Sequence, residues 1–223
     1  MTKELFIQAI IKFISGIILM GLLLFVPAGT IHYPNGWILM AILFIPMFIA
    51  GIIMMIYNPE LLKKRLNAKE EQNDQKTVIA LSGTMFLAAF ITAGLNLRFN
   101  WMHFPKWVVY LGIALFLASY AMFGEVLREN TYLSRTVEVQ ENQKVVDTGL
   151  YGIIRHPMYS ATLILFLSMG LVLDSPISFL ILLTYIPIIA KRIENEEEVL
   201  EKGLEGYKEY KQKVKYKVIP WIW

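Results

Sequence analysis

Two polar clusters near the C-terminal end of the sequence hold residues suited to binding a charged small molecule. In residues 149–159, Arg155 and His156 precede a proline, and in residues 192–200 an arginine is followed by a run of glutamates. Arginine and histidine donate hydrogen bonds to anions, and carboxylates accept them from cations. The clusters flank two apolar segments, so a hairpin of those segments would bring the clusters face to face.

The second cluster has helical spacing. On a helix, Arg192 and Glu196 are i,i+4 neighbours, and Glu197 lies one position round. One basic and two acidic groups would then point towards the segment that contains Arg155 and His156.

Each cluster also has a simpler structural interpretation. The acidic run 194–198 is compatible with an exposed helix face, and Arg155 and Arg192 with anchors at a membrane surface. His156 alone suits a structural hydrogen bond, but its position before a proline favours an extended backbone that can face a ligand. Taken together, the clusters favour a ligand site. The three histidines are far apart in the sequence, so no metal site is predicted.

The composition excludes a soluble domain. Of the 223 residues 56% are hydrophobic and 17% are charged, whereas soluble domains have about 25% charged residues. The apolar residues lie in runs of about 20, the length of a membrane span. The absence of cysteine excludes disulfides and thiolate metal sites. A net charge of +3 is too small to predict a nucleic-acid partner, and no protein partner is predicted.

The apolar runs predict an all-α integral membrane protein with about six membrane helices. The last two form a short hairpin around a turn at residues 174–176, and whether they fully span the bilayer stays open. A helical, charged tail follows from Lys191 to about Val214, and the alternating residues 136–146 suit a small β-hairpin. The predicted membrane segments are Leu5–Val26, Trp37–Tyr57, Val78–Leu97, Trp107–Leu127, Tyr159–Leu173 and Ile177–Ala190.

Basic residues predict the orientation. With the N-terminus inside, only Arg98 and Lys106 fall on a fully outer loop, which is a strong positive-inside bias. The polar segments 128–156 and 191–223 then both lie on the cytoplasmic face. We therefore expect four N-terminal membrane helices in residues 1–127 and a catalytic region in residues 128–223.

The ordered set of residues in this C-terminal region resembles the isoprenylcysteine carboxyl methyltransferase and phospholipid methyltransferase superfamily. The shared pattern is a G-x-Y-x-x-x-R-H-P-x-Y stretch, an apolar hairpin, and then R-x-x-x-E-E-x-x-L. Here these are residues 149–159 and 192–200, and the resemblance extends over about residues 128–223. The chain departs from the family at Leu150, where proline is frequent. The bacterial character of the pattern implies a plasma membrane.

The resemblance implies a cytoplasmic loop region that binds S-adenosyl-L-methionine, and an acceptor that enters from the bilayer. The aromatic faces of Tyr151 and Tyr159 suit a cationic sulfonium. Glu196 or Glu197 would accept from the amino group of the cofactor, and Arg155 or His156 would donate to its carboxylate. The cofactor-binding residues predicted in this way are Gly149, Tyr151, Arg155, His156, Pro157, Tyr159 and Glu196.

The resemblance also implies the catalytic residues, Arg192 and Glu197. Arg192 would orient a lipophilic acceptor, and Glu197 would take up a proton if the acceptor is an amine or a thiol. A carboxylate acceptor needs no base. The identity of the acceptor, whether prenylcysteine-like or a lipid amine or thiol, stays open.

Several alternatives remain at this stage. A sterol-reductase-type enzyme would bind NADPH through Arg155, Arg192, Arg135 and Lys144, and a non-catalytic lipid-binding protein would bind no adenosyl cofactor. The tail tyrosines are expected to pack the C-terminal helix onto the membrane core, with covering of the cofactor as the alternative. These tyrosines are Tyr207, Tyr210 and Tyr216, and the polar residues whose role in the pocket stays open are Asn130, Ser134 and Gln140.

Overall fold

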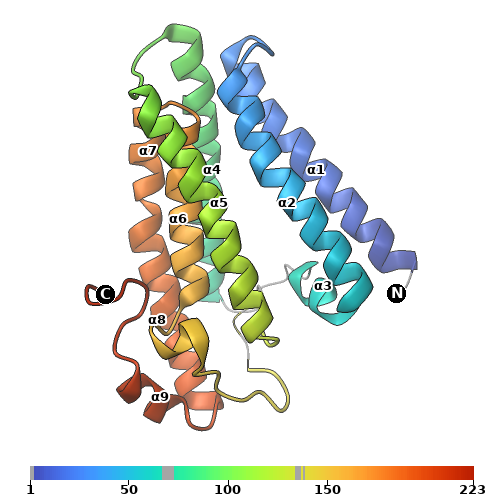
Figure 1. Cartoon of the computed structure of the whole chain (residues 1–223), viewed down its shortest axis with the longest axis vertical. Coiled ribbons are helices and arrows are strands. Elements are labelled where there is room, and N and C mark those ends of the chain that lie inside the picture. Colours follow the sequence, from blue (N-terminus) through green and yellow to red (C-terminus); the bar gives the residue numbers. More distant parts are fainter. Residues whose placement is uncertain (1–2, 67–72, 134–136, 138) are drawn as a thin grey trace.

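The computed structural model describes residues 3–66, 73–133, 137 and 139–223, and this part of the chain is a bundle of helices (Figure 1). Its long helices run roughly parallel to one axis, as the apolar runs predict. The helices are α1 (Lys3–Ala28), α2 (Pro34–Tyr57), α3 (Pro59–Leu66), α4 (Asn73–Phe99), α5 (Lys106–Glu129), α6 (Pro157–Val172), α7 (Pro176–Leu183), α8 (Tyr185–Gly203) and α9 (Tyr207–Lys213), with one 3-10 turn, η1 (Gly149–Gly152).

The membrane character of the bundle is confirmed. Five segments of the described chain are long and apolar enough to cross a membrane, namely α1, α2, α4 from Gln75, α5, and the continuous stretch of α7 and α8. α6 is shorter, with 16 residues. Many large apolar side chains on α1 and α2 are exposed, as expected for helices that face lipid.

Prolines determine where several helices begin. Pro34, Pro157 and Pro176 each occupy the first turn, where the missing N–H removes no helical hydrogen bond. The turn before α7 also has Ser175 as its N-cap, which accepts a hydrogen bond from the Ser178 amide. The predicted turn at residues 174–176 is therefore present.

The second arm of the predicted hairpin differs in length from the expectation. It is divided at Thr184 into α7 and α8, and α8 continues past Ala190 to Gly203. Pro187 explains the division, because it cannot donate to the carbonyl of Leu183, the last residue of α7. The extra length of α8 carries the second polar cluster directly out of the bundle.

The helices α5, α6 and α7 approach one another closely. A Cβ atom on Gly112 of α5 would lie 2.6 Å from Cβ of Leu171, and one on Gly170 of α6 would lie 2.7 Å from Cα of Phe179. Small residues at such contacts allow membrane helices to pack backbone against backbone. This packing fixes the C-terminal part of α6 against α5 and α7.

Two local predictions are corrected. Residue 137 and residues 139–147 form turns and irregular backbone instead of a β-hairpin, while Thr136 and Glu138 lie outside the described residues. The charged tail is not one helix to Val214, because it breaks at Leu204 and restarts as α9 after Gly206, whose φ of +82° suits glycine. The break turns α9 back towards η1, as Figure 1 shows.

Candidate functional site

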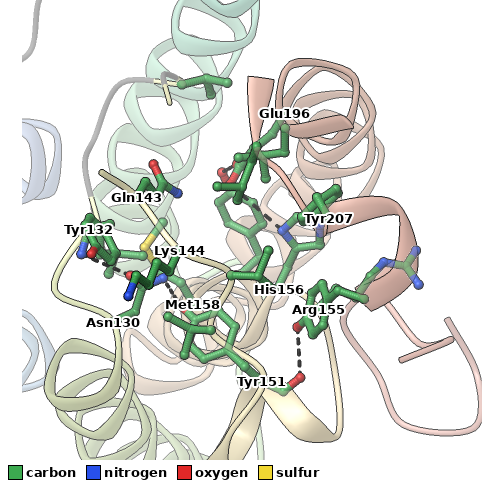
Figure 2. Close-up of a pocket in the computed structure, with 18 of the residues that line it drawn as sticks. Asn130, Tyr132, Gln143, Lys144, Tyr151, Arg155, His156, Met158, Glu196 and Tyr207 are labelled. Atoms are coloured by element: carbon green, nitrogen blue, oxygen red, sulfur yellow. Dashed lines mark hydrogen bonds and ion pairs between the residues drawn. The ribbon is translucent and has the colours of Figure 1, made fainter. Parts of the chain in front are cut away.

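A pocket opens at the end of the bundle where α8 leaves it. Its walls come from the loop after α5, the 3-10 turn η1, the first turn of α6, α8 and α9. The volume of its enclosed part is about 100 Å³, which is smaller than most small-molecule sites. A ligand of cofactor size would therefore also occupy the mouth that opens to solvent. Figure 2 shows His156, Glu196 and Tyr207 on one side and Asn130, Gln143 and Lys144 on the other.

The segment with Arg155 and His156 is fixed by the C-terminal tail. The Arg155 amide donates to the Tyr216 carbonyl at 2.9 Å, and the His156 amide donates to the Lys217 carbonyl at 2.8 Å. The Arg155 guanidinium also donates to the carbonyls of Val214 and Lys215, at 2.7 and 2.8 Å. Two regions 60 residues apart in sequence are thus joined beneath the pocket.

Glu197 is the centre of a buried charge network under the pocket. Its Oε1 accepts from Arg155 Nε at 2.8 Å and lies 3.1 Å from His156 Nε2. Its Oε2 lies 3.2 Å from Lys211 Nζ and 3.8 Å from Lys217 Nζ. The Glu197 side chain is only 5% exposed and does not line the pocket. Among the described residues, the partners of this carboxylate are three cations and the imidazole, so Glu197 holds the floor of the site together.

Glu196, one residue earlier, points into the pocket instead. Tyr159 donates a hydrogen bond from its hydroxyl to the Glu196 carboxylate and accepts one from Arg192 Nε at 3.0 Å. The His156 ring stacks on the Tyr159 ring, with centroids 5.6 Å apart. Successive residues of a helix are rotated by about 100°, which places Glu196 and Arg192 on the pocket side and Glu197 towards the tail.

The turn η1 supplies a second wall of the pocket. Tyr151 accepts a hydrogen bond on its hydroxyl from Asn130 Nδ2 at 3.0 Å, and its carbonyl accepts one from the Tyr210 hydroxyl at 2.8 Å. Gly149 begins the turn with a φ of +50°, and a Cβ there would lie 2.2 Å from the Glu129 carboxylate. The positive φ favours glycine, and a side chain here would displace the Glu129 carboxylate, so Gly149 helps to shape the turn.

The structure brings most of the predicted site residues together. Those that line the pocket are Tyr151, Arg155, His156, Tyr159, Arg192 and Glu196, and the polar residue Asn130 joins them. Gly149, Pro157 and Glu197 lie next to the pocket but do not line it. Gln140 does not line it either. Ser134 and Arg135 lie outside the described residues.

Two tail tyrosines belong to the pocket as well as to the packing of α9. Tyr207 and Tyr210 are buried, and both line the pocket. Burial raises the pKa of both phenols well above the usual value, so they remain neutral donors. The Tyr207 hydroxyl is buried and has no hydrogen-bond partner among the described residues. An unpaired buried donor in a pocket wall is the atom that a bound ligand would satisfy.

Other wall residues, among them Gln143 and Met158, were not singled out as site residues from the sequence. Gln143 and Lys144 come from the loop that was expected to be a β-hairpin, and Met158 from the first turn of α6. Met158 sits inside the recognised cluster, so its position between His156 and Tyr159 was the available signal. No local pattern marked Gln143, whereas Lys144 was named from the sequence only as a residue that would bind NADPH in the reductase alternative.

Comparisons with known proteins agree with the geometry. Residues 110–202 match the model of the isoprenylcysteine carboxyl methyltransferase (ICMT) family. A solved structure, titled the eukaryotic intramembrane Ras methyltransferase ICMT without a monobody, has the same fold with a TM-score of 0.57 and 18% identity. The match covers 92% of this chain and 74% of that one. No curated protein matched the sequence. The resemblance inferred from the two clusters is confirmed by the family match.

Proposed function

We propose that this chain, whose residues 110–202 carry the ICMT family pattern, is an integral membrane methyltransferase that uses S-adenosylmethionine and a lipophilic acceptor. The observation that carries the proposal is the linked set of Arg192, Tyr159 and Glu196 in the wall of a pocket at the end of a membrane bundle. The basic residues counted along the sequence support a cytoplasmic position for that end, with both termini inside.

The residues present fit this cofactor. Glu196 offers a carboxylate for its amino group, Tyr151 and Tyr159 offer aromatic faces for its cationic sulfur, and the Tyr207 hydroxyl offers an unused donor. When bound, the cofactor supplies a methyl group activated by its positive charge. The protein groups bind and orient the reactants, which is the main requirement of an in-line displacement.

The geometry changes the role proposed for Arg155. Its Nε is used by Glu197 and its NH1 by two tail carbonyls. These contacts leave it poorly placed to grip the carboxylate of the cofactor, so we assign Arg155 to holding the floor of the pocket. Lys144, in the opposite wall, is a cation whose position suits that carboxylate.

The network around Glu197 also bears on the acceptor. A carboxylate that is buried among cations and turned away from the pocket is a poor proton acceptor for an amine or a thiol. Arg192, in contrast, lines the pocket and can orient an anionic group. These two facts favour an acceptor whose reacting group is a carboxylate, because methylation of a carboxylate needs no base.

A lateral groove supports a lipophilic acceptor. It lies between α4 and the α7–α8 arm, has a volume of about 610 Å³, and reaches from Ala88 to Lys191, next to Arg192. Its lining is mostly apolar, so it suits a hydrocarbon chain whose polar end is near Arg192. The apolar lining residues are Val78, Leu81, Met85, Ala88, Pro187 and Ile188.

Calorimetric binding of S-adenosylmethionine to the detergent-purified protein tests the proposal, with NADPH as the control ligand. We expect binding of S-adenosylmethionine alone, weakened in a Glu196→Ala variant. Methyl transfer to extracted lipids or to an S-prenylcysteine would then appear as a mass increase of one methyl group. Binding of NADPH in its place would make the chain a reductase, and binding of neither would make it a non-catalytic protein.

The Tyr207 hydroxyl gives a sharper test of the cofactor site. A Tyr207→Phe variant is expected to bind S-adenosylmethionine about three- to tenfold more weakly, the effect of losing one hydrogen bond. Its thermal stability without ligand should be unchanged, because the hydroxyl has no partner in the described protein.

Tyr210→Phe is the matched control for this variant. It removes a hydroxyl that bonds the Tyr151 carbonyl at 2.8 Å, so we expect its melting temperature to fall without ligand. If calorimetry finds wild-type affinity in Tyr207→Phe, the hydroxyl does not contact the cofactor.

A further inference from the structure

A glutamine outside both polar clusters contacts the proposed catalytic arginine. Gln75 lies in the first described turn of α4 and is fully buried, with 0% of its surface exposed. Its Oε1 accepts from Arg192 NH1 at 3.2 Å, and its Nε2 donates to the Arg192 carbonyl at 3.4 Å. Both ends of one buried amide are therefore used by the same residue.

We propose that Gln75 is a positioning residue that fixes the Arg192 guanidinium for the acceptor. The inference rests on the proposed function and deepens it, because it gives the N-terminal helices a part in the site. Residue 75 lies outside the segment that matches the family, residues 110–202.

The contacts hold the guanidinium from two directions. Gln75 binds NH1 from the α4 side, and the Tyr159 hydroxyl accepts from Nε on the α6 side. Arginine side chains have several rotatable bonds, and contacts at two separate nitrogens restrict them to one orientation. The same arginine lines the pocket, so its orientation determines where an anionic acceptor group is held.

The chemistry of an amide suits this task. A carboxylate at position 75 would bond the guanidinium equally well but would add a negative charge beside it. The amide oxygen orients the guanidinium and contributes no charge. A neutral orienting group preserves the attraction of Arg192 for an anionic substrate group.

Packing of α4 against its neighbours does not by itself explain why Gln75 bonds Arg192. α4 packs against α7 and α8 over a long interface, and apolar residues such as Ile189 and Ile193 provide buried surface on α8. A buried polar group adds little to such an interface unless both of its ends are satisfied. In Gln75 both the oxygen and the nitrogen of the amide bond Arg192, a residue of the site. A residue that positions Arg192 would make these two contacts.

The test compares Gln75→Leu and Gln75→Glu with wild-type protein in detergent. The acceptors are an N-acetylated S-farnesylcysteine as the carboxylate probe and a total membrane lipid extract. For Gln75→Leu we expect kcat to fall about tenfold, with unchanged affinity for S-adenosylmethionine. For Gln75→Glu, which keeps the hydrogen bond to NH1, we expect a higher KM for the carboxylate probe. A purely structural role would not separate kcat from KM in this way.

Ser82→Ala is the matched control on the same helix, because among the described residues the Ser82 hydroxyl donates to the Val78 carbonyl within α4. Its kinetics should equal those of the wild type. A double-mutant cycle with Arg192→Lys should show that Gln75→Leu adds little once the guanidinium is gone.

The possible failures are distinguishable. Wild-type protein that binds no S-adenosylmethionine, or transfers no methyl group to either acceptor, overturns the proposed function together with this inference. Normal wild-type turnover with unchanged kcat in Gln75→Leu, or full additivity in the cycle, overturns the inference alone. Should Gln75→Leu not fold, as judged by its melting temperature, the KM of Gln75→Glu decides, and an unchanged KM is contrary to the inference.

Discussion

A Glu197→Ala variant is expected to lose thermal stability and cofactor binding together. Removal of this carboxylate leaves Arg155 and His156, both buried, without the group that joins them. Breaking a buried ion pair by removing one partner costs about 3–5 kcal/mol. The floor of the pocket would loosen, because the tail cations Lys211 and Lys217 lose the same partner. Thermal unfolding in detergent and calorimetry with S-adenosylmethionine measure the two effects.

Glu198→Ala is the control on the same helix. The Glu198 side chain is 67% exposed and pairs with the exposed Lys202, so its loss should change stability by less than about 1 kcal/mol. The experiment also separates two roles for Glu197. If Glu197→Ala folds and binds the cofactor normally but transfers no methyl group to an amine or a thiol, Glu197 acts as the base that the resemblance implies.

The comparison of Glu196 with Glu197 marks a limit of reasoning from sequence. Helical spacing correctly predicted that Arg192 and Glu196 share a face. It also placed Glu197 close to Arg155 and His156, and in the structure Glu197 contacts both residues. It could not tell which carboxylate faces the pocket, because that depends on where the C-terminal tail crosses α8. The tail position is a tertiary fact, fixed by hydrogen bonds such as that from the Arg155 amide to Tyr216.

The fold was easier to predict than the walls of the pocket. Runs of apolar residues predicted the first five membrane helices to within about five residues of their observed bounds, since the length of a span is set by the bilayer. The last one differs, because it is divided into α7 and α8 and extends to Gly203. Gln75 had no such signal. It lies at the polar start of an apolar helix, and its contact with Arg192 joins residues 117 positions apart. Tyr207 was recognised as aromatic and packed, but its unpaired hydroxyl is visible only in three dimensions.

These long-range contacts indicate how the N-terminal helices and the C-terminal region both contribute to the site. Tail and α8 contacts build the floor of the pocket, whereas α4 contacts the site through Gln75 in its first turn. The groove between α4 and α8 extends to Lys191, the residue before Arg192. A lipophilic acceptor would therefore meet the cofactor side of the site at Arg192, where the two surfaces join.

The largest expected effect on turnover, with little effect on folding, comes from Arg192. We expect Arg192→Ala to lower kcat/KM for a carboxylate acceptor by about 10²–10³-fold, the typical effect of removing one group that stabilises charge in a transition state. The fold should persist, because Arg192 is only partly buried and α8 has a large apolar face at Ile189 and Ile193. Radiolabelled methyl transfer measures the loss, and calorimetry should show that the cofactor still binds.

Arg192→Lys tests whether charge or geometry is responsible. Lysine keeps the positive charge, but its single ammonium lacks the planar set of donors with which Arg192 binds both the Tyr159 hydroxyl and the Gln75 amide oxygen. If orientation matters as we propose, Arg192→Lys will recover only a small part of the lost activity. If it restores wild-type turnover, charge alone is sufficient at this position, and the contacts with Tyr159 and Gln75 serve only to pack α8. Wild-type kinetics in Arg192→Ala would remove Arg192 from the catalytic site altogether, and the acceptor would then have to be held by Lys144 on the opposite wall.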